Sequence, residues 1–180
     1  YGADALRLTL ITGNAPGNDM RFYWERVESS RNFANKLWNA SRFIMMHLGE
    51  ENPVEPADEL LEPSDRFILS KVNTLAADVT ENMDKYELGI AADKVTQFIW
   101  EEFCDWYIEI AKVRLYKKDT EPERANAALW TLRTVLIDAL KLLHPFMPFI
   151  TEEIFCTLQS EEESIMIARW PEFTDRRCYP

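Results

Sequence analysis

The apolar residues between Trp100 and Lys112 recur every three or four positions, which is the spacing of one face of an α-helix. On a helix that advances about 100° per residue, the acidic residues of the same stretch fall on the opposite side. The chain also has only five glycines in 180 residues and few alternating β-branched runs. These features predict an all-α fold built from amphipathic helices. The predicted core face comprises Trp100, Phe103, Cys104, Tyr107, Ile110 and Ala111.

Turn signals divide the chain into several helices. Gly13, Pro16 and Gly17 cannot continue a first helix, Gly49 is expected to end the second as its C′ residue, and Pro63 occupies a tolerated first-turn position. The architecture that follows is a helical bundle of four to five long helices joined by short turns. The expected helices cover residues 3–11, 23–48, 64–83, 86–115, 125–143 and 151–158.

The buried side of this bundle can be read from the apolar spacing. Besides Phe103 and Tyr107, we expect Trp100 and Leu136 to be core residues that hold the helices together. The second helix has its own core-facing stripe. Its members are Val27, Ser30, Ala34, Leu37, Ser41, Ile44 and Leu48.

The overall charge argues against a general nucleic-acid binder. The chain has 20 basic and 31 acidic residues, which gives a net charge of −11 at pH 7 and a pI near 4.7. Affinity for phosphates comes mainly from Lys and Arg. Between Arg21 and Arg42, however, five basic residues stand against two acidic ones. A nucleic-acid surface is therefore expected only where basic residues gather locally, as they do on the second helix.

The second helix carries a line of polar and aromatic residues beside its core stripe. Arg31, Asn35, Trp38 and Arg42 follow one another at i, i+4, i+7 and i+11. Single-stranded RNA loops are read by stacking on aromatic or guanidinium planes and by hydrogen bonds to base edges, and this line supplies both. The alternative is that Trp38 is half-buried core and that the arginines pair with acids on neighbouring helices. The candidate RNA-binding residues are Arg31, Asn35, Lys36, Trp38, Asn39 and Arg42, with Lys36 and Asn39 on the other side of the core stripe.

A second basic cluster lies at the end of the fourth expected helix. Lys112, Arg114, Lys117 and Lys118 form it. These residues either touch phosphate or simply offset the negative end of the helix dipole, and the sequence does not separate the two.

Signatures of catalysis, of metal binding and of membrane insertion are missing from the sequence. There is no GxSxG, P-loop or HExxH motif, and the glycine-containing loop at residues 12–19 lacks the lysine of a phosphate loop. The cysteines are scattered, and His47 and His144 are far apart, so no metal site is expected. His144, followed by proline, is expected to be a packed corner. No apolar run approaches the roughly 20 residues that span a bilayer.

Five segments, in order, resemble valyl-tRNA synthetases, which are class I aminoacyl-tRNA synthetases. They span nearly the whole chain, which makes the resemblance far more specific than any single motif. It implies the anticodon-binding helical bundle of such an enzyme. The segments are YGADALR at residues 1–7, RNFANKLWNASRF at 31–43, DRFILSK at 65–71, WEEFCDWYIEIAK at 100–112 and LHPFMPFITEEIF at 143–155.

This resemblance implies that the bundle holds the anticodon arm of valine tRNA while a separate catalytic domain joins valine to the tRNA with ATP and Mg. The HIGH and KMSKS signatures that handle ATP in class I synthetases are absent here. We therefore expect no catalytic residue, no metal and no cofactor in this chain, which begins with Tyr1 and reads as an excised domain of a cytoplasmic enzyme.

We expect three parts within the domain. Residues 1–19 would form the junction from the catalytic domain, residues 20–159 the anticodon-binding bundle, and residues 160–180 an apolar tail that docks on it. Two alternatives stay open. Isoleucyl- and leucyl-tRNA synthetases share the bundle and the LHPFMPF-like segment, and a helical protein-interaction module that binds no RNA would fit the acidic surface.

Overall fold

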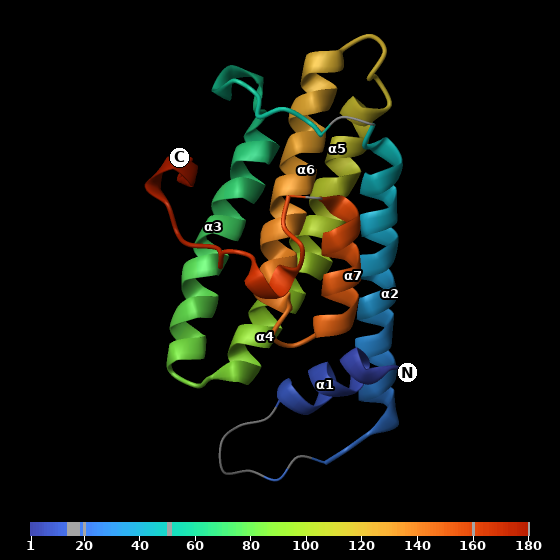
Figure 1. Ribbon diagram of the computed structural model, residues 1–180, viewed down its shortest axis with the longest axis vertical. Helices are drawn as coiled ribbons and strands as arrows, with labels where there is room; N and C mark the ends of the chain where they lie inside the picture. The colour runs from blue at the N-terminus through green and yellow to red at the C-terminus, as the bar shows by residue number, and fades with distance from the viewer. Residues whose placement is uncertain (14–18, 20, 50–51, 160, 180) are drawn as a thin grey trace.

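The computed structural model describes residues 1–13, 19, 21–49, 52–159 and 161–179, and its regular elements are all helical in that part of the chain. The predicted all-α fold is therefore confirmed (Figure 1). Most of the glycine-containing loop predicted at residues 12–19 falls outside the described residues. The main helices are α1 (Ala3–Ile11), α2 (Trp24–His47), α3 (Pro63–Asp84), α4 (Leu88–Gln97), η2 (Phe98–Tyr107), α5 (Ile108–Leu115), α6 (Pro122–Leu143) and α7 (Pro148–Leu158), and short 3₁₀ turns are η1 (Asp58–Leu60), η3 (Ile165–Ile167) and η4 (Asp175–Arg177).

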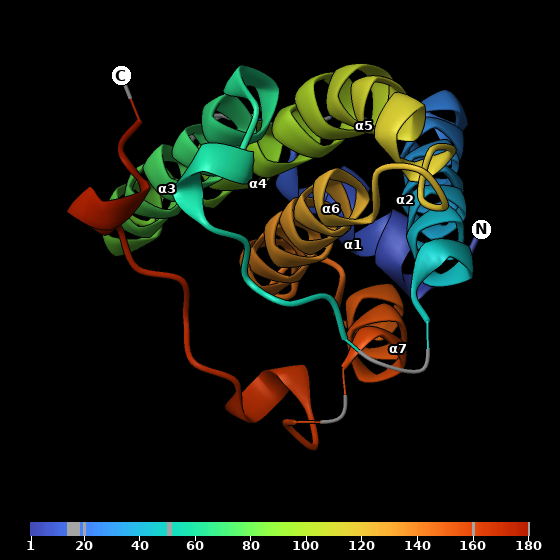
Figure 2. The ribbon, with the colours of Figure 1, turned by 90° about the horizontal axis from the view of Figure 1, so that it is seen from above.

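The long helices run alternately up and down the bundle. In Figure 1, α2 rises, α3 descends, the continuous α4–η2–α5 helix rises behind them, and α6 descends again. Figure 2 shows α6 in the middle, with α2, α3, the α4–α5 helix and α7 around it. α1 crosses the lower end of α2, so the chain's first residue and the α3–α4 turn both lie at that end, opposite the α5–α6 connection.

The core follows from this central position of α6. Its apolar side chains are buried against every surrounding helix, and Leu132, Leu136 and Leu140 are fully inaccessible to solvent. Phe103 and Tyr107 from η2 are also fully buried and join the same cluster, which confirms three of the four predicted core residues. In α2 the predicted stripe is likewise turned inward. Its buried members are Val27, Ser30, Leu37, Ser41 and Ile44, and Ala34 and Leu48 pack against the core while partly buried.

The prediction that Trp100 is a core residue is wrong, because this residue is 37% exposed. The reason is that η2 is a π-helix, whose i→i+5 hydrogen bonds give a wider turn than the α-helix that we assumed. The buried residues of this segment, Phe98, Ile99, Phe103 and Tyr107, recur every four to five positions, and Trp100 lies at the surface between them. There its ring stacks on Phe33, with ring centroids 6.4 Å apart.

The helix ends agree only in part with the turn signals, since α6 and α7 begin three residues earlier than predicted, at Pro122 and Pro148. Pro63 is the first residue of α3, as predicted. Gly49 does not act as a left-handed C′ residue: α2 ends at His47, its C-cap Leu48 is in extended backbone (φ −67°, ψ 131°), and Gly49 does not have a positive φ. Gly13, after α1, does have one (φ 69°). A side chain at this position would be strained by the left-handed backbone, whereas the nearest atom to a Cβ there is the mobile end of Arg26 (Nη2, 2.6 Å).

The segment after α7 runs back along α3 and α6. Trp170 donates its indole N–H to Thr80 Oγ1 (2.9 Å). The Asn73 side-chain amide donates a hydrogen bond to the Thr174 carbonyl and accepts one from the Thr174 N–H (2.9 Å each). Arg177 pairs with Asp138 at 2.7 Å. These contacts join the last residues to the bundle, and the three-part division of the chain stays a prediction. Within the described residues, no helix combines the length and the apolarity needed to cross a membrane.

Candidate nucleic-acid interface

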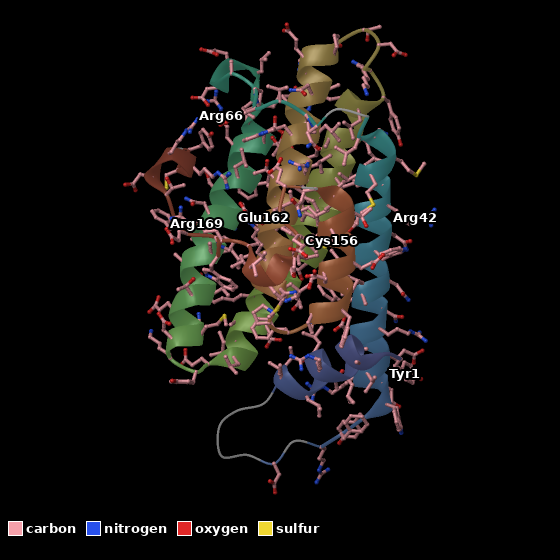
Figure 3. The ribbon with its side chains drawn as sticks, viewed as in Figure 1. Tyr1, Arg42, Arg66, Cys156, Glu162 and Arg169 are labelled. Atoms are coloured by element: carbon pink, nitrogen blue, oxygen red, sulfur yellow. The ribbon has the colours of Figure 1, made fainter. Side chains whose placement is uncertain are left out.

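The outward face of α2 is the surface on which the candidate residues lie. Because α2 stands at the edge of the bundle, only one of its sides meets the core (Figure 2). Asn35 and Asn39 are exposed on the other side, and Trp38 is 38% exposed. Arg42 is exposed too, and Figure 3 shows it pointing away from the helices. Among the described residues, no acidic side chain forms an ion pair with Arg42.

Arg31 lies at the lower end of this line and is already engaged. Its guanidinium forms an ion pair with Glu28 at 3.1 Å and bonds Asn32 Oδ1 at the same distance. It also lies over the ring of Tyr1, 5.3 Å from the centroid. An exposed pair of this kind contributes at most about 1 kcal/mol, so the guanidinium can exchange Glu28 for a phosphate at small cost.

Lys36 points to the other flank of α2, toward the π-helix. Its ammonium pairs with Asp105 at 2.5 Å and lies over the Trp100 ring, 3.8 Å from the centroid. Its side chain is only 24% exposed. Lys36 is thus separated from the Arg31–Arg42 line, and its role in RNA binding stays a prediction that requires it to leave Asp105.

Trp38 forms part of the wall of a shallow groove of about 440 Å³ between α1, α2 and α7. Tyr1, Phe149 and Ala34 line the apolar part of this groove, and Glu153 supplies a carboxylate. Together with Glu28 beside Arg31, Glu153 makes the lower half of the α2 face less favourable for phosphate. The upper half of the helix, around Arg42, is the more favourable part of this face for phosphate.

The second basic cluster is smaller than predicted, because Arg114 does not reach the surface. Arg114 is only 4% exposed, which excludes the phosphate-contact alternative for this residue. Lys112 pairs with Glu109 at 2.5 Å, and Lys117 lies 3.6 Å from Glu121. Lys118 is exposed and, within the described part of the chain, forms no ion pair. The accessible cluster therefore consists of the three lysines.

Arg114 belongs instead to a buried ionic cluster that the sequence analysis missed. It holds the Asp65 carboxylate through both guanidinium nitrogens, one of them at 2.6 Å, and Asp65 is completely buried. Tyr107 donates its hydroxyl to the same carboxylate at 2.6 Å, and the Glu62 backbone N–H donates at 2.9 Å. Burial and the negative charge of Asp65 raise the pKa of Tyr107 well above its usual range. Burial alone would lower the pKa of Arg114, but its bonds to Asp65 outweigh this and raise it.

The remaining chemistry-bearing residues have structural surroundings. His144 Nδ1 lies 2.8 Å from Thr151 Oγ1 in the packed corner between α6 and α7, as predicted, and burial lowers its pKa. The acidic residues Glu101, Asp105 and Glu109 follow an exposed helix side. In the described ranges no three His, Cys, Asp or Glu side chains gather closely enough to hold a metal ion.

Comparison with known proteins links this architecture to a family. The model of the family "Anticodon-binding domain of tRNA ligase" matches residues 65–177. The chain is 55% identical to the valine–tRNA ligase of Clostridium tetani over 178 residues, which cover 97% of this chain and 20% of that protein. It is 56% identical to the valine–tRNA ligase of Clostridium perfringens over 177 residues, with the same shares. The chain therefore spans about a fifth of the length of these relatives.

A solved structure shares the fold at lower sequence similarity. It is described as the ternary complex of Agrobacterium radiobacter K84 agnB2 LeuRS-tRNA-LeuAMS, and it superposes with a TM-score of 0.70 over 99% of this chain and 20% of that one. With 17% identity, this likeness concerns the fold alone. The family match itself covers more than half of the sequence. From the helical architecture and this match together, the chain belongs to the family of anticodon-binding domains of tRNA ligases.

Proposed function

We propose that this chain binds the anticodon arm of valine tRNA as part of a longer protein that attaches valine to that tRNA. The observation that carries the proposal is the identity of 55% and 56% to two valine–tRNA ligases over almost the full length of the chain. The longer protein would use ATP with Mg at a catalytic site outside this chain and would act in the cytoplasm.

The competing assignments have less support. The shared fold with a LeuRS structure does not favour leucine, because at 17% identity it reports architecture only. A protein-interaction module without RNA would be consistent with the net charge of −11, but the family match favours tRNA binding. Many basic side chains of the described region pair with acids, so we expect this chain alone to bind weakly and the rest of the longer protein to supply much of the affinity.

The exposed line on α2 is the proposed contact surface, with Arg42 as a phosphate contact and Trp38 as a stacking group. In the full-length protein, Arg42→Ala should weaken tRNA binding and flatten the salt dependence by roughly 0.7–0.9 units of log–log slope, because one phosphate contact is lost. Trp38→Ala should weaken binding by about 1–3 kcal/mol and leave the slope unchanged, since stacking is not electrostatic. Titration of labelled tRNA at several salt concentrations measures both.

Arg169→Ala is the matched control for Arg42→Ala. Arg169 is also an exposed arginine, with 81% of its side chain accessible, but it lies on the opposite side of the bundle (Figure 3). The Arg169→Ala variant should bind tRNA with the parent's affinity and the parent's salt dependence. If the Arg42 and Trp38 variants stay folded and also bind like the parent, the tRNA contacts a different face.

A further inference from the structure

A second groove lies between α3 and α6. Residues 168–179, here called the tail segment, run across it from η3 to the outer side of α3 (Figures 1 and 2). Leu69, Val72 and Ala76 form the buried apolar floor of this groove. A space of about 660 Å³ remains between the floor and the tail segment. Because protein interiors are normally close-packed, the tail segment covers the α3–α6 groove without filling it.

Asn73 and Ser70, on one face of α3, hold the backbone of the tail segment. The Asn73 side-chain amide donates a hydrogen bond to the Thr174 carbonyl and accepts one from the Thr174 N–H (2.9 Å each). Ser70 Oγ accepts a hydrogen bond from the Tyr179 N–H (3.0 Å). Thr174 is in extended backbone (φ −138°, ψ 135°). Main-chain contacts of this kind bind an extended peptide irrespective of its side chains.

The charges of the α3–α6 groove and of the tail segment are complementary. Arg177 pairs with Asp138 at 2.7 Å, and Arg176 pairs with Glu55 at 3.0 Å. Burial raises the pKa of Asp138, and the neighbouring guanidinium of Arg177 acts against this rise. The body of the domain thus presents more carboxylates than ammonium groups to its occupant, which favours a basic peptide. The charged residues that the body contributes to the lining are Glu55, Asp58, Asp138 and Lys141.

The tail segment is held by these polar contacts more than by burial. None of residues 168–179 is buried, although Asn73 beneath them is only 4% exposed. Trp170 and Tyr179 pack against the core while partly buried, and the Trp170 indole N–H donates to Thr80 Oγ1 (2.9 Å). A segment with few buried apolar contacts opens locally at a much lower free energy than global unfolding requires. The tail segment can therefore leave the groove while the bundle stays folded.

We propose that the α3–α6 groove is a binding surface for an extended basic peptide. The tail segment occupies it in the structure, and a peptide of the same chemistry from another protein takes its place when the tail segment leaves. The tail segment shows what that chemistry is: a tryptophan that donates its indole N–H, an extended backbone at the fourth residue after it, and an arginine three residues further on. This surface goes beyond the proposed tRNA binding and does not depend on it.

The test measures binding of a fluorescent peptide to the full-length protein. The peptide has the sequence of residues 168–179 with Cys178→Ser, and the receptor is the double variant Trp170→Ala with Arg177→Ala, whose own tail segment has lost its side-chain anchors. The peptide should bind this variant saturably and more weakly as the salt concentration rises, because ion pairs are screened. It should bind the parent at least about tenfold more weakly, because the intact tail segment competes at a high effective concentration.

Substitutions in the groove of this receptor test the contacts themselves. Adding Asn73→Ala should weaken peptide binding by about 5- to 150-fold, because two hydrogen bonds are lost. Adding Asp138→Asn should weaken binding and reduce its salt dependence, because the arginine of the peptide loses its ionic partner. Asn82→Ala is the matched control, since Asn82 is also on α3 but donates its amide to the Asp78 carbonyl of the same helix (2.6 Å). It should leave peptide binding unchanged.

Melting curves show whether each variant is folded, and Arg177→Ala alone serves as the receptor if the double variant is not. A folded receptor that does not bind the peptide, or that binds a scrambled peptide of the same composition equally well, shows that the inference is wrong. Peptide affinity that is unchanged by both Asn73→Ala and Asp138→Asn would place the peptide elsewhere on the protein and would also overturn it.

Discussion

Replacing Arg114 by Met is expected to destabilise the bundle by about 3–5 kcal/mol, because it leaves the buried Asp65 carboxylate without its charged partner. Asp65 is fully inaccessible to solvent, so water cannot take over the role of the guanidinium. The Tyr107 hydroxyl and the Glu62 N–H remain as donors, but neither carries a positive charge. For a chain of this size the loss corresponds to a melting temperature lower by roughly 6–20 °C. Thermal or denaturant unfolding of the purified chain measures it.

Arg124→Met is the matched control for this change. Arg124 also pairs with Glu62, and with Glu121 at 2.8 Å, but 53% of its side chain is exposed. An exposed pair contributes at most about 1 kcal/mol, so this variant should melt close to the parent. Changing Asp65 to Asn together with Arg114→Met should recover much of the loss, because the uncompensated charge is then gone. Equal destabilisation by the two arginine variants would contradict the buried cluster.

Phe103→Ala is expected to cost about 3–5 kcal/mol, since it removes a fully buried ring from the π-helical part of the bundle and leaves a cavity. Phe103 packs in the same core cluster as Tyr107, whose ring centroid is 6.4 Å away, and the neighbouring helices cannot collapse fully into the space. Its loss is a large share of a domain stability of roughly 5–15 kcal/mol. Chemical denaturation should show a lower midpoint with little change in slope.

Trp100→Ala tests whether the π-helical phase is correct. Because Trp100 is 37% exposed, stacks on Phe33 and lies under the Lys36 ammonium, its removal should cost about 1–2 kcal/mol. In a regular α-helix Trp100 and Phe103, three positions apart, would both face the core. Similar losses for Trp100→Ala and Phe103→Ala would therefore contradict the wider turn.

The sequence was enough to predict the helices and the inward side of α2, because apolar spacing and turn residues act locally. Residues 3–11 were predicted as a helix and match α1. The position of Trp100 could not be predicted in the same way. A constant advance of about 100° per residue is assumed in such a reading, and nothing in the local pattern indicates where a helix widens.

The sequence predicted which side of α2 faces outward, but it did not predict which residues the candidate side chains contact. Arg42 was placed outward by periodicity alone, which the structure agrees with. The pairing of Lys36 with Asp105 and of Arg114 with Asp65 links residues 69 and 49 positions apart, and only the tertiary fold brings them together. One local signal existed for Arg114, since it lies between Val113 and Leu115 with Ala111 one turn before it. A charged residue at a core-phase position is rarely buried without a partner.

The most direct measurement of the central claim is the affinity of the full-length protein for valine tRNA and for the same tRNA with its anticodon replaced. If this domain reads the anticodon arm, the replaced tRNA should bind at least about fivefold more weakly, since the loss of a base contact costs about 1–3 kcal/mol. Trp38→Ala should reduce that difference while Arg169→Ala leaves it unchanged. Equal affinity for the two tRNAs, with the parent protein folded and binding, would contradict the account.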